Sequence, residues 1–261
     1  MRLHKKSIFY TKKDVSYNYH HMEHGEKKKD YLLPGSILFS ALLISFALFY
    51  SAGKQATQNV IVPNEQQNET LSAASLAKNV NPISSSDHTL GPSTAPLKII
   101  VFSDPECPYC KDHHFMLKEV MNKMPGKIQI VLRNFPLSGH TQSKQEIVAS
   151  ECVADLRGND AFWKYMDNIF ESTPSNDGLD LSLLPQFATA LGIERKKFEE
   201  CVQSGKFDAA IEQTVQNAKE SGLTGTPYSI LIAPNGQYIP LGGYFPIEEF
   251  QSIVEQALKQ A

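Results

Sequence analysis

The chain has 261 residues with a formal net charge of −3, of which 41% are hydrophobic and 20% charged. This length and composition suit one or two compact globular domains. The near-neutral charge argues against a dedicated nucleic-acid-binding protein, and four cysteines are too few for a disulfide-rich miniprotein.

The N-terminal part predicts a membrane anchor. Residues 1–30 form a basic tail with eight Lys and Arg against four acids, and no charged residue follows between Asp30 and Lys54. The apolar stretch 31–53 is long enough to cross a hydrocarbon core of about 30 Å. Because three lysines, 27–29, directly precede it, we expect a single-pass signal anchor in the bacterial cytoplasmic membrane with its N-terminus inside.

Two other interpretations of this stretch remain open. A cleavable signal peptide would place Ser51 and Gly53 at positions −3 and −1 of the cleavage site, although the basic tail is long for one. A buried core helix is disfavoured because the stretch is apolar all round. In either membrane interpretation the rest of the chain is extracytoplasmic, and residues 54–84, rich in Gln, Asn, Ser and Ala, predict a flexible linker.

Two strands and a helix follow the linker. The run Leu97–Phe102 is apolar and rich in β-branched residues, as in a buried strand. Apolar residues then recur at helical spacing between Phe115 and Met124, where Pro125-Gly126 ends the helix. Ile128–Phe135 predicts the second strand.

The next segment, about 141–221, predicts a helical insertion. Its amphipathic stretches are Ile147–Leu156, Ala161–Phe170, Leu183–Leu191 and Phe207–Ser221, with LGIERKK among the breaks between them. A hairpin of Tyr228–Ala233 with Tyr238–Leu241 comes next, and Pro246 opens a final helix. The order β-α-β, helical insertion, β-β-α predicts an α/β fold.

A redox motif, Cys107-Pro108-Tyr109-Cys110, lies between the first strand and the first helix. At a helix N-terminus, unpaired backbone N–H groups and the helix dipole stabilise the thiolate of the first cysteine. Pro108 suits an early helical position because it needs no hydrogen-bond acceptor there. We therefore expect thiol–disulfide exchange at Cys107 and Cys110, with no cofactor beyond that disulfide.

Metal binding is the alternative for the same segment. Cys107 and Cys110 together with His113 and His114 offer two thiols and two imidazoles. Tetrahedral sites usually draw ligands from two elements, so we predict no metal, and we expect both histidines on a solvated helix surface.

Together these motifs resemble the DsbA-like branch of the thioredoxin superfamily over about 87–261. The resemblance rests on HTLGPSTAPLKIIVFSDPECPYCK (88–111), RNFPL (133–137), DAFWKYMDNIF (160–170) and GTPYSILI (225–232), in the family's order. It implies a thioredoxin fold with an inserted α-helical subdomain in residues 85–261. It also implies that Cys107 is the nucleophile and Cys110 the resolving thiol.

The resemblance gives a role to Pro227, which opens a strand and would there remove a hydrogen-bond donor. In the family a cis-proline loop lies against the active-site disulfide and holds an extended client. Pro227 is then the cis-proline, and Pro108, Tyr109 and Thr226 are expected to contact the client. The alternative is an ordinary trans turn.

Cys152 and Cys201 fall in the insertion. If Cys107 pairs with Cys110, only a disulfide between Cys152 and Cys201 remains, and similar exported relatives have such a pair. Two buried free thiols, or a redox relay to the active site, are the alternatives.

Two acids precede the nucleophile. Asp104 either modulates Cys110, as an acid at this place does in relatives, or caps the helix. Glu106 is expected to oppose thiolate formation slightly.

The sequence thus predicts a membrane-anchored, extracytoplasmic thiol–disulfide oxidoreductase that forms disulfides in exported proteins. By the resemblance, a membrane thiol oxidase would recharge its active site. A reductase or isomerase with the same site would need a membrane electron donor. A peptide-holding chaperone or metal carrier is the alternative from another class.

Overall fold

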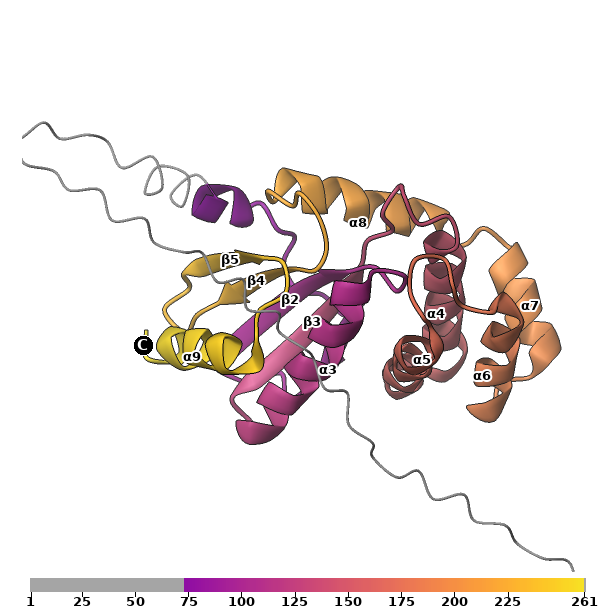
Figure 1. Cartoon of the computed structure of the whole chain (residues 1–261), viewed down its shortest axis with the longest axis horizontal. Coiled ribbons are helices and arrows are strands. Elements are labelled where there is room, and N and C mark those ends of the chain that lie inside the picture. The colour runs from indigo at the N-terminus through magenta and orange to yellow at the C-terminus, as the bar shows by residue number, and fades with distance from the viewer. Residues whose placement is uncertain (1–72, 261) are drawn as a thin grey trace, which may run out of the picture. The chain divides into compact units, whose positions relative to one another are not determined.

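The computed structural model describes residues 73–260, shown in colour in Figure 1. The predicted basic tail, the predicted membrane anchor and the first part of the predicted linker lie outside these residues. Within 73–260, no helix combines the length and the apolar character needed to cross a bilayer.

A five-stranded mixed sheet forms the centre of the domain. Its strands lie in the order β1-β3-β2-β4-β5, with β2 and β3 parallel and the other neighbours antiparallel. Their bounds are β1 His88–Leu90, β2 Leu97–Ser103, β3 Ile128–Asn134, β4 Tyr228–Ile232 and β5 Tyr238–Gly242. The pairing of β2 with β4 joins segments on either side of the helical insertion.

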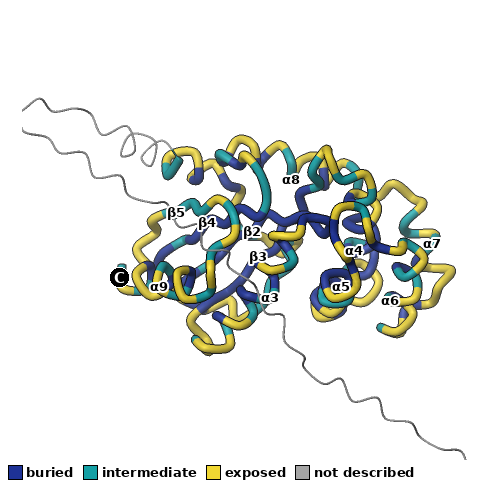
Figure 2. Tube along the Cα trace, in the orientation of Figure 1, coloured by how far each residue is buried: buried dark blue, intermediate teal, exposed yellow. Residues whose placement is uncertain are grey.

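Both faces of the sheet are covered, which explains why β3 is buried along its whole length and β2 is buried everywhere except at Lys98. Helices α3 (Pro108–Lys123) and α9 (Ile247–Leu258) pack on one face, and α8 (Asp208–Glu220) packs on the other (Figure 1). The trace in Figure 2 accordingly shows the central strands as the buried part of the domain.

The helical insertion contains one helix more than the sequence predicted. It consists of α4 Ser143–Arg157, α5 Asn159–Ser172, the 3-10 turn η1 Leu181–Leu183, α6 Leu184–Ala190, α7 Arg195–Gln203 and α8. Helix α7 begins inside LGIERKK, which the sequence analysis wrongly took as a break. Only Phe198 of α7 is fully buried, with Cys201 and Val202 beside it on the same face, so the apolar face of this helix is short and lies among charged residues.

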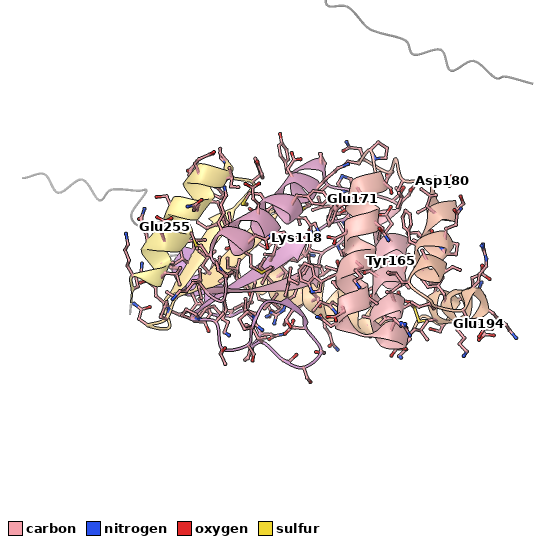
Figure 3. All side chains as sticks on the ribbon, turned by 90° about the horizontal axis from the view of Figure 1, so that it is seen from below. Lys118, Tyr165, Glu171, Asp180, Glu194 and Glu255 are labelled. Carbon is pink, nitrogen blue, oxygen red and sulfur yellow. A yellow bond between two sulfur atoms is a disulfide. The ribbon has the colours of Figure 1, made fainter. Side chains whose placement is uncertain are left out.

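The core of the insertion forms around aromatic side chains. Tyr165 of α5, labelled in Figure 3, is fully buried and donates a hydrogen bond to the Leu184 carbonyl at 3.0 Å. Its ring lies edge-on to Phe187, with 6.2 Å between the ring centroids. These contacts hold α5 against α6.

The last residues of the predicted linker pack against the domain. A short helical segment at 73–77 leads to Val80, and Ala77 and Val80 are buried in the core on the α8 face. Asn217 of α8 fixes the segment, since its side chain accepts from the Asn81 N–H and donates to the Asn79 carbonyl, both at 2.9 Å. The packed domain therefore begins before the predicted boundary at residue 85.

Candidate active site

The motif CPYC forms the start of α3, directly after β2. Cys107 is the N-cap of α3 and Pro108 occupies its first turn, as predicted. Cys107 and Cys110 both carry free thiols and are buried, whereas the Tyr109 side chain is 61% exposed. The first helical turn brings the cysteines together, because the Cys110 N–H donates to the Cys107 carbonyl at 3.0 Å.

The loop before β4 lies against this turn. The Thr226–Pro227 peptide bond is cis, and the Cys107 thiol donates to the Thr226 carbonyl at 3.6 Å. The Pro227 carbonyl accepts from the Gly243 N–H at 2.8 Å, which ties the loop to the end of β5. The fold thus brings Thr226 and Pro227 to the cysteines from more than a hundred residues away in the sequence.

The two thiols differ strongly in acidity. Hydrogen bonding from the Cys110 thiol is the main effect that lowers the pKa of Cys107, to about 6, although burial acts in the opposite direction. The Thr226 side chain and two backbone N–H groups at the start of α3 also lower this pKa. Burial and the neighbouring Cys107 raise the pKa of Cys110 well above its ordinary value. Cys107 therefore loses its proton more readily than an ordinary cysteine, and Cys110 holds its proton more firmly.

Asp104 is buried and holds the backbone around the site. Its carboxylate accepts from the Glu106 N–H at 2.7 Å and from the Leu137 N–H at 2.6 Å. His140 approaches the same carboxylate at 3.1 Å. The Asp104 N–H donates to the Cys110 sulfur at 3.4 Å, so Asp104 contacts Cys110 through its backbone.

The predicted solvent exposure of His113 and His114 is wrong. Both are buried, because α3 is covered by α5 on one side and α9 on the other. His113 Nε2 lies 3.0 Å from the Ser229 hydroxyl, and burial together with the charge of His114 lowers its pKa to about 3. His114 Nε2 pairs with Asp167 at 2.7 Å, and burial lowers its pKa despite this partner. The periodicity of one helix cannot show which of its faces other elements cover.

These histidines are not arranged with the cysteines as a metal site. Over residues 73–260, no three side chains of His, Cys, Asp or Glu are grouped as metal ligands.

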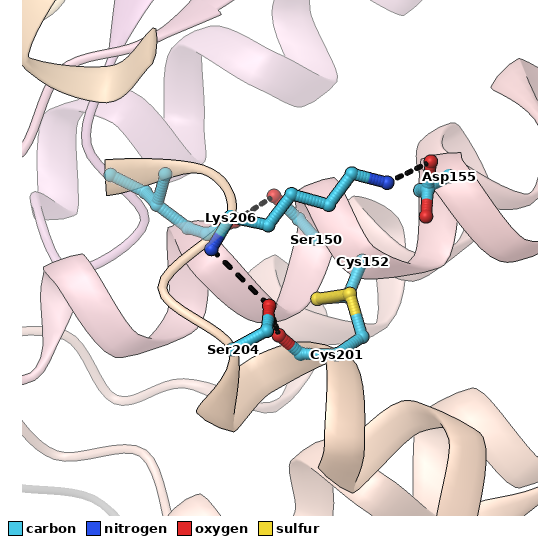
Figure 4. The surroundings of a disulfide bond; sticks show 7 residues. Ser150, Cys152, Asp155, Cys201, Ser204 and Lys206 are labelled. Atoms are coloured by element: carbon cyan, nitrogen blue, oxygen red, sulfur yellow. Dashed lines mark hydrogen bonds and ion pairs between the residues drawn. A yellow bond between two sulfur atoms is a disulfide. The ribbon is translucent and has the colours of Figure 1, made fainter. Parts of the chain in front are cut away.

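Cys152 of α4 and Cys201 of α7 form a disulfide, with 5.8 Å between their Cα atoms (Figure 4). Beside it, the Lys206 ammonium pairs with the Asp155 carboxylate at 2.6 Å. The disulfide joins two helices of the insertion and closes a loop whose ends are 49 positions apart in the sequence.

The sequence did not indicate that Glu146 of α4 lies near Glu106. It also did not indicate that loop 173–178 contacts Glu106, directly before the motif, and Gln142, directly before α4. In the sequence, Glu106 stands out only as the residue directly before Cys107. Its partner could not be identified because the path of the insertion over the site is not encoded in local periodicity.

A thioredoxin family model matches residues 84–255. The chain therefore belongs to the thioredoxin family, and within it has the fold of the DsbA-like thiol–disulfide oxidoreductases. The fold is similar to that of DsbA2 from Pseudomonas aeruginosa, with 23% sequence identity, a TM-score of 0.58, and coverage of 69% of this chain and 98% of that one. Oxidised BdbD from Bacillus subtilis gives 21% identity and a TM-score of 0.59, over 69% of this chain and 97% of that one.

Curated sequences give two kinds of relative. A Na(+)/H(+) antiporter NhaA 3 from Salinispora tropica is 28% identical over 142 residues, which are 54% of this chain and 21% of the antiporter. A probable disulfide bond formation protein D from Bacillus anthracis is 24% identical over 55% of this chain and 68% of that protein. The chain thus spans about a fifth of the length of the antiporters it matches.

Proposed function

We propose that this protein forms disulfide bonds in exported proteins by exchange at Cys107 and Cys110. The observation that carries the proposal is the pair of thiols with opposite acidity, a low pKa at Cys107 and a high pKa at Cys110, beside the cis Thr226–Pro227 bond. Family membership and the likeness to the Bacillus anthracis relative support the same chemistry.

In the proposed cycle the enzyme begins as the Cys107–Cys110 disulfide. A client thiolate attacks Cys107, forming a mixed disulfide, and Cys110 leaves as a thiolate that takes up a proton. A second client thiolate then attacks the client sulfur of the mixed disulfide, and Cys107 leaves as a thiolate. The client loses two electrons and the enzyme gains them, so the dithiol form must be reoxidised. We propose a membrane thiol oxidase as the oxidant.

The recognition of the client would use the exposed edge of the site. The backbone of Thr226 lies beside Cys107, and we propose that an extended peptide pairs with it there. Pro108 and the exposed Tyr109 ring border the same sulfur. We propose that Thr226, Pro108 and Tyr109 contact the client, while Cys110 stays buried until the mixed disulfide forms.

The acidity of Cys107 supports the proposed oxidising direction. A thiolate stabilised in the dithiol form makes the disulfide form a better oxidant. A pKa of about 6 lies between those of thioredoxin (about 7) and DsbA (about 3.5). We therefore expect a reduction potential for residues 73–261 between about −270 and −120 mV in glutathione redox buffers. A potential at or below the thioredoxin value would contradict the oxidase proposal and favour a reductase supplied by an electron donor.

We also propose that residues 31–53 anchor the enzyme in the cytoplasmic membrane, with the catalytic domain outside. The apolar stretch and the lysines before it support this topology. Expressed in a bacterium as the full chain, the protein is expected to stay in the membrane pellet after alkaline washing and to be digested by protease added to spheroplasts. Release of a shortened form into the periplasm would instead show a cleaved signal peptide.

A further inference from the structure

Loop 173–178 of the insertion has an unusual backbone. It lies between α5 and η1, and Figure 3 labels Glu171 and Asp180, which flank it. Residues 175–177, none of which is glycine, have positive φ angles of 69°, 55° and 62°. This left-handed conformation is unfavourable for L-residues, so a run of three persists only where the surrounding structure enforces it. Such strain is concentrated at active sites and ligand clamps.

Hydrogen bonds hold the loop to the chain that enters α4. The Asp177 carboxylate accepts from the N–H and the hydroxyl of Thr141, both at 3.0 Å, and from the Gln142 N–H at 2.9 Å. Within the loop, the Ser175 N–H donates to the Thr173 hydroxyl at 2.9 Å. These bonds fix the left-handed residues in one conformation.

The same loop is bound to the residue directly before the nucleophile. The Asn176 N–H donates to the Glu106 carbonyl at 2.8 Å. The Thr173 hydroxyl and the Gly178 N–H donate to the Glu106 carboxylate, both at 3.1 Å. Because one peptide unit joins Glu106 to Cys107, the Cα atom of Asn176 lies within about 8 Å of the Cα atom of Cys107.

The loop and the Thr226–Pro227 bond flank the CPYC motif from opposite sides. The motif follows β2, which lies between β3 and β4 in the sheet. The chain that leaves β3 leads to residues 141–142, to which the loop is bonded. On the other side, Tyr228 follows Pro227 and pairs with Phe102 near the end of β2. Figure 1 agrees, since α4 and α5 lie on one side of α3 and β4 and β5 on the other.

Asn176 is exposed and lies within reach of a client bound at Cys107. A mixed disulfide places the Cα atom of the client cysteine about 5.5–6 Å from that of Cys107, and an extended chain advances about 3.3 Å per residue. The client residues next to the disulfide therefore pass close to Asn176. Its side-chain amide can donate to a peptide carbonyl and accept from a peptide N–H.

We propose that loop 173–178 forms the second wall of the client site, opposite Thr226, and that the Asn176 amide binds the main chain of the client beside its cysteine. The inference rests on the proposed exchange function and deepens it, because it adds a client-binding residue from the insertion. Main-chain groups are common to all peptides but absent from small dithiols. Asn176 is thus a specificity-determining residue that favours extended peptide clients over small thiols.

The test replaces Asn176 by glycine, which accepts the left-handed backbone and removes the amide. Oxidation of a reduced client peptide with two cysteines is compared with oxidation of dithiothreitol, which has no peptide groups. Asn176→Gly should raise the KM for the peptide about fivefold and leave kcat unchanged, as the loss of one hydrogen bond predicts. The rate with dithiothreitol and the pH dependence of Cys107 alkylation should stay at their wild-type values, which separates client binding from an effect on the thiol.

Asn235→Gly is the matched control. Asn235 is an exposed asparagine in the turn between β4 and β5, at the end of β4 remote from Pro227. This variant should oxidise both substrates like the wild type. Equal losses with the peptide and with dithiothreitol in Asn176→Gly would show that the loop only supports the thiol, and would overturn the proposal. Unchanged oxidation of the peptide would overturn it as well.

A trapped complex decides the question should Asn176→Gly fail to fold. In a Cys110→Ser protein with the natural loop, the Cys107 thiolate attacks a peptide carried as its mixed disulfide with thionitrobenzoate, and thionitrobenzoate leaves. A benzophenone on the peptide residue before or after the cysteine should then crosslink to residues 174–178. Crosslinks confined to the residues around Thr226 would contradict the proposal. A wild type that oxidises neither substrate would refute the proposed function, whereas the crosslink, which needs no turnover, still tests the wall.

Discussion

A Cys107→Ser enzyme is expected to lose disulfide exchange with a reduced client, by on the order of a thousandfold or more, while keeping its fold. Serine cannot form the mixed disulfide, and no other thiol reaches the site, since Cys110 is almost fully buried behind Cys107. The measurement is turnover of a reduced client peptide in glutathione buffer, with circular dichroism as the test of folding.

The Cys110→Ser enzyme is the matched control for this result. It keeps the nucleophile but cannot resolve the mixed disulfide, so it should accumulate a covalent complex with the client that a reducing agent releases. If the Cys107→Ser protein retained full function with an intact fold, the cysteines would not be catalytic. A peptide-holding or metal-carrying role would then be the better account.

Removing the disulfide of the insertion is expected to lower the free energy of unfolding by about 4 kcal/mol. This is the loop-closure value for about 50 residues, and for a domain of this size it corresponds to a melting temperature lower by roughly 10 °C. The variant is Cys152→Ala with Cys201→Ala, and the measurement is thermal unfolding without reductant. The reduction potential at Cys107 should not change, because the disulfide lies between α4 and α7.

Lys206→Ala supplies the comparison, because the pair of Lys206 with Asp155 lies beside the same disulfide and is half-exposed. Exposed pairs contribute about 1 kcal/mol or less, so its melting temperature should change little. Equal melting temperatures for the double alanine variant and the wild type would contradict a stabilising disulfide. Mass spectrometry of unreduced peptides would show directly whether 152 and 201 are linked.

The motifs and the elements on either side of the helical insertion could be predicted from local sequence. The apolar runs at β2 and β3, the turn Pro234-Asn235-Gly236 and Pro246 before α9 each carry their signal within a few residues. The position of CPYC at a helix start follows from the same local pattern. These features are set by backbone preferences and by burial of adjacent side chains.

What could not be predicted depends on contacts between distant segments. Helix α7 has only a short apolar face, Phe198, Cys201 and Val202, and the disulfide partner of Cys201 lies 49 residues away in the sequence. His113 and His114 are buried because other helices cover α3, and Glu146 meets Glu106 only because α4 passes over the site. In each case the decisive neighbour lies tens of residues away, where periodicity gives no information.

The central position of β2, between β3 and β4, has a consequence for when the protein becomes chemically active. One neighbour of β2 follows it closely, whereas the other is encoded after the whole insertion, together with Thr226 and Pro227. A nascent chain therefore carries the CPYC motif long before the loop that contacts Cys107 has been synthesised. The contribution of Thr226 to the acidity of Cys107 therefore becomes available only after the insertion has been synthesised, whereas the contributions of Cys110 and of the first turn of α3 are encoded within the motif itself.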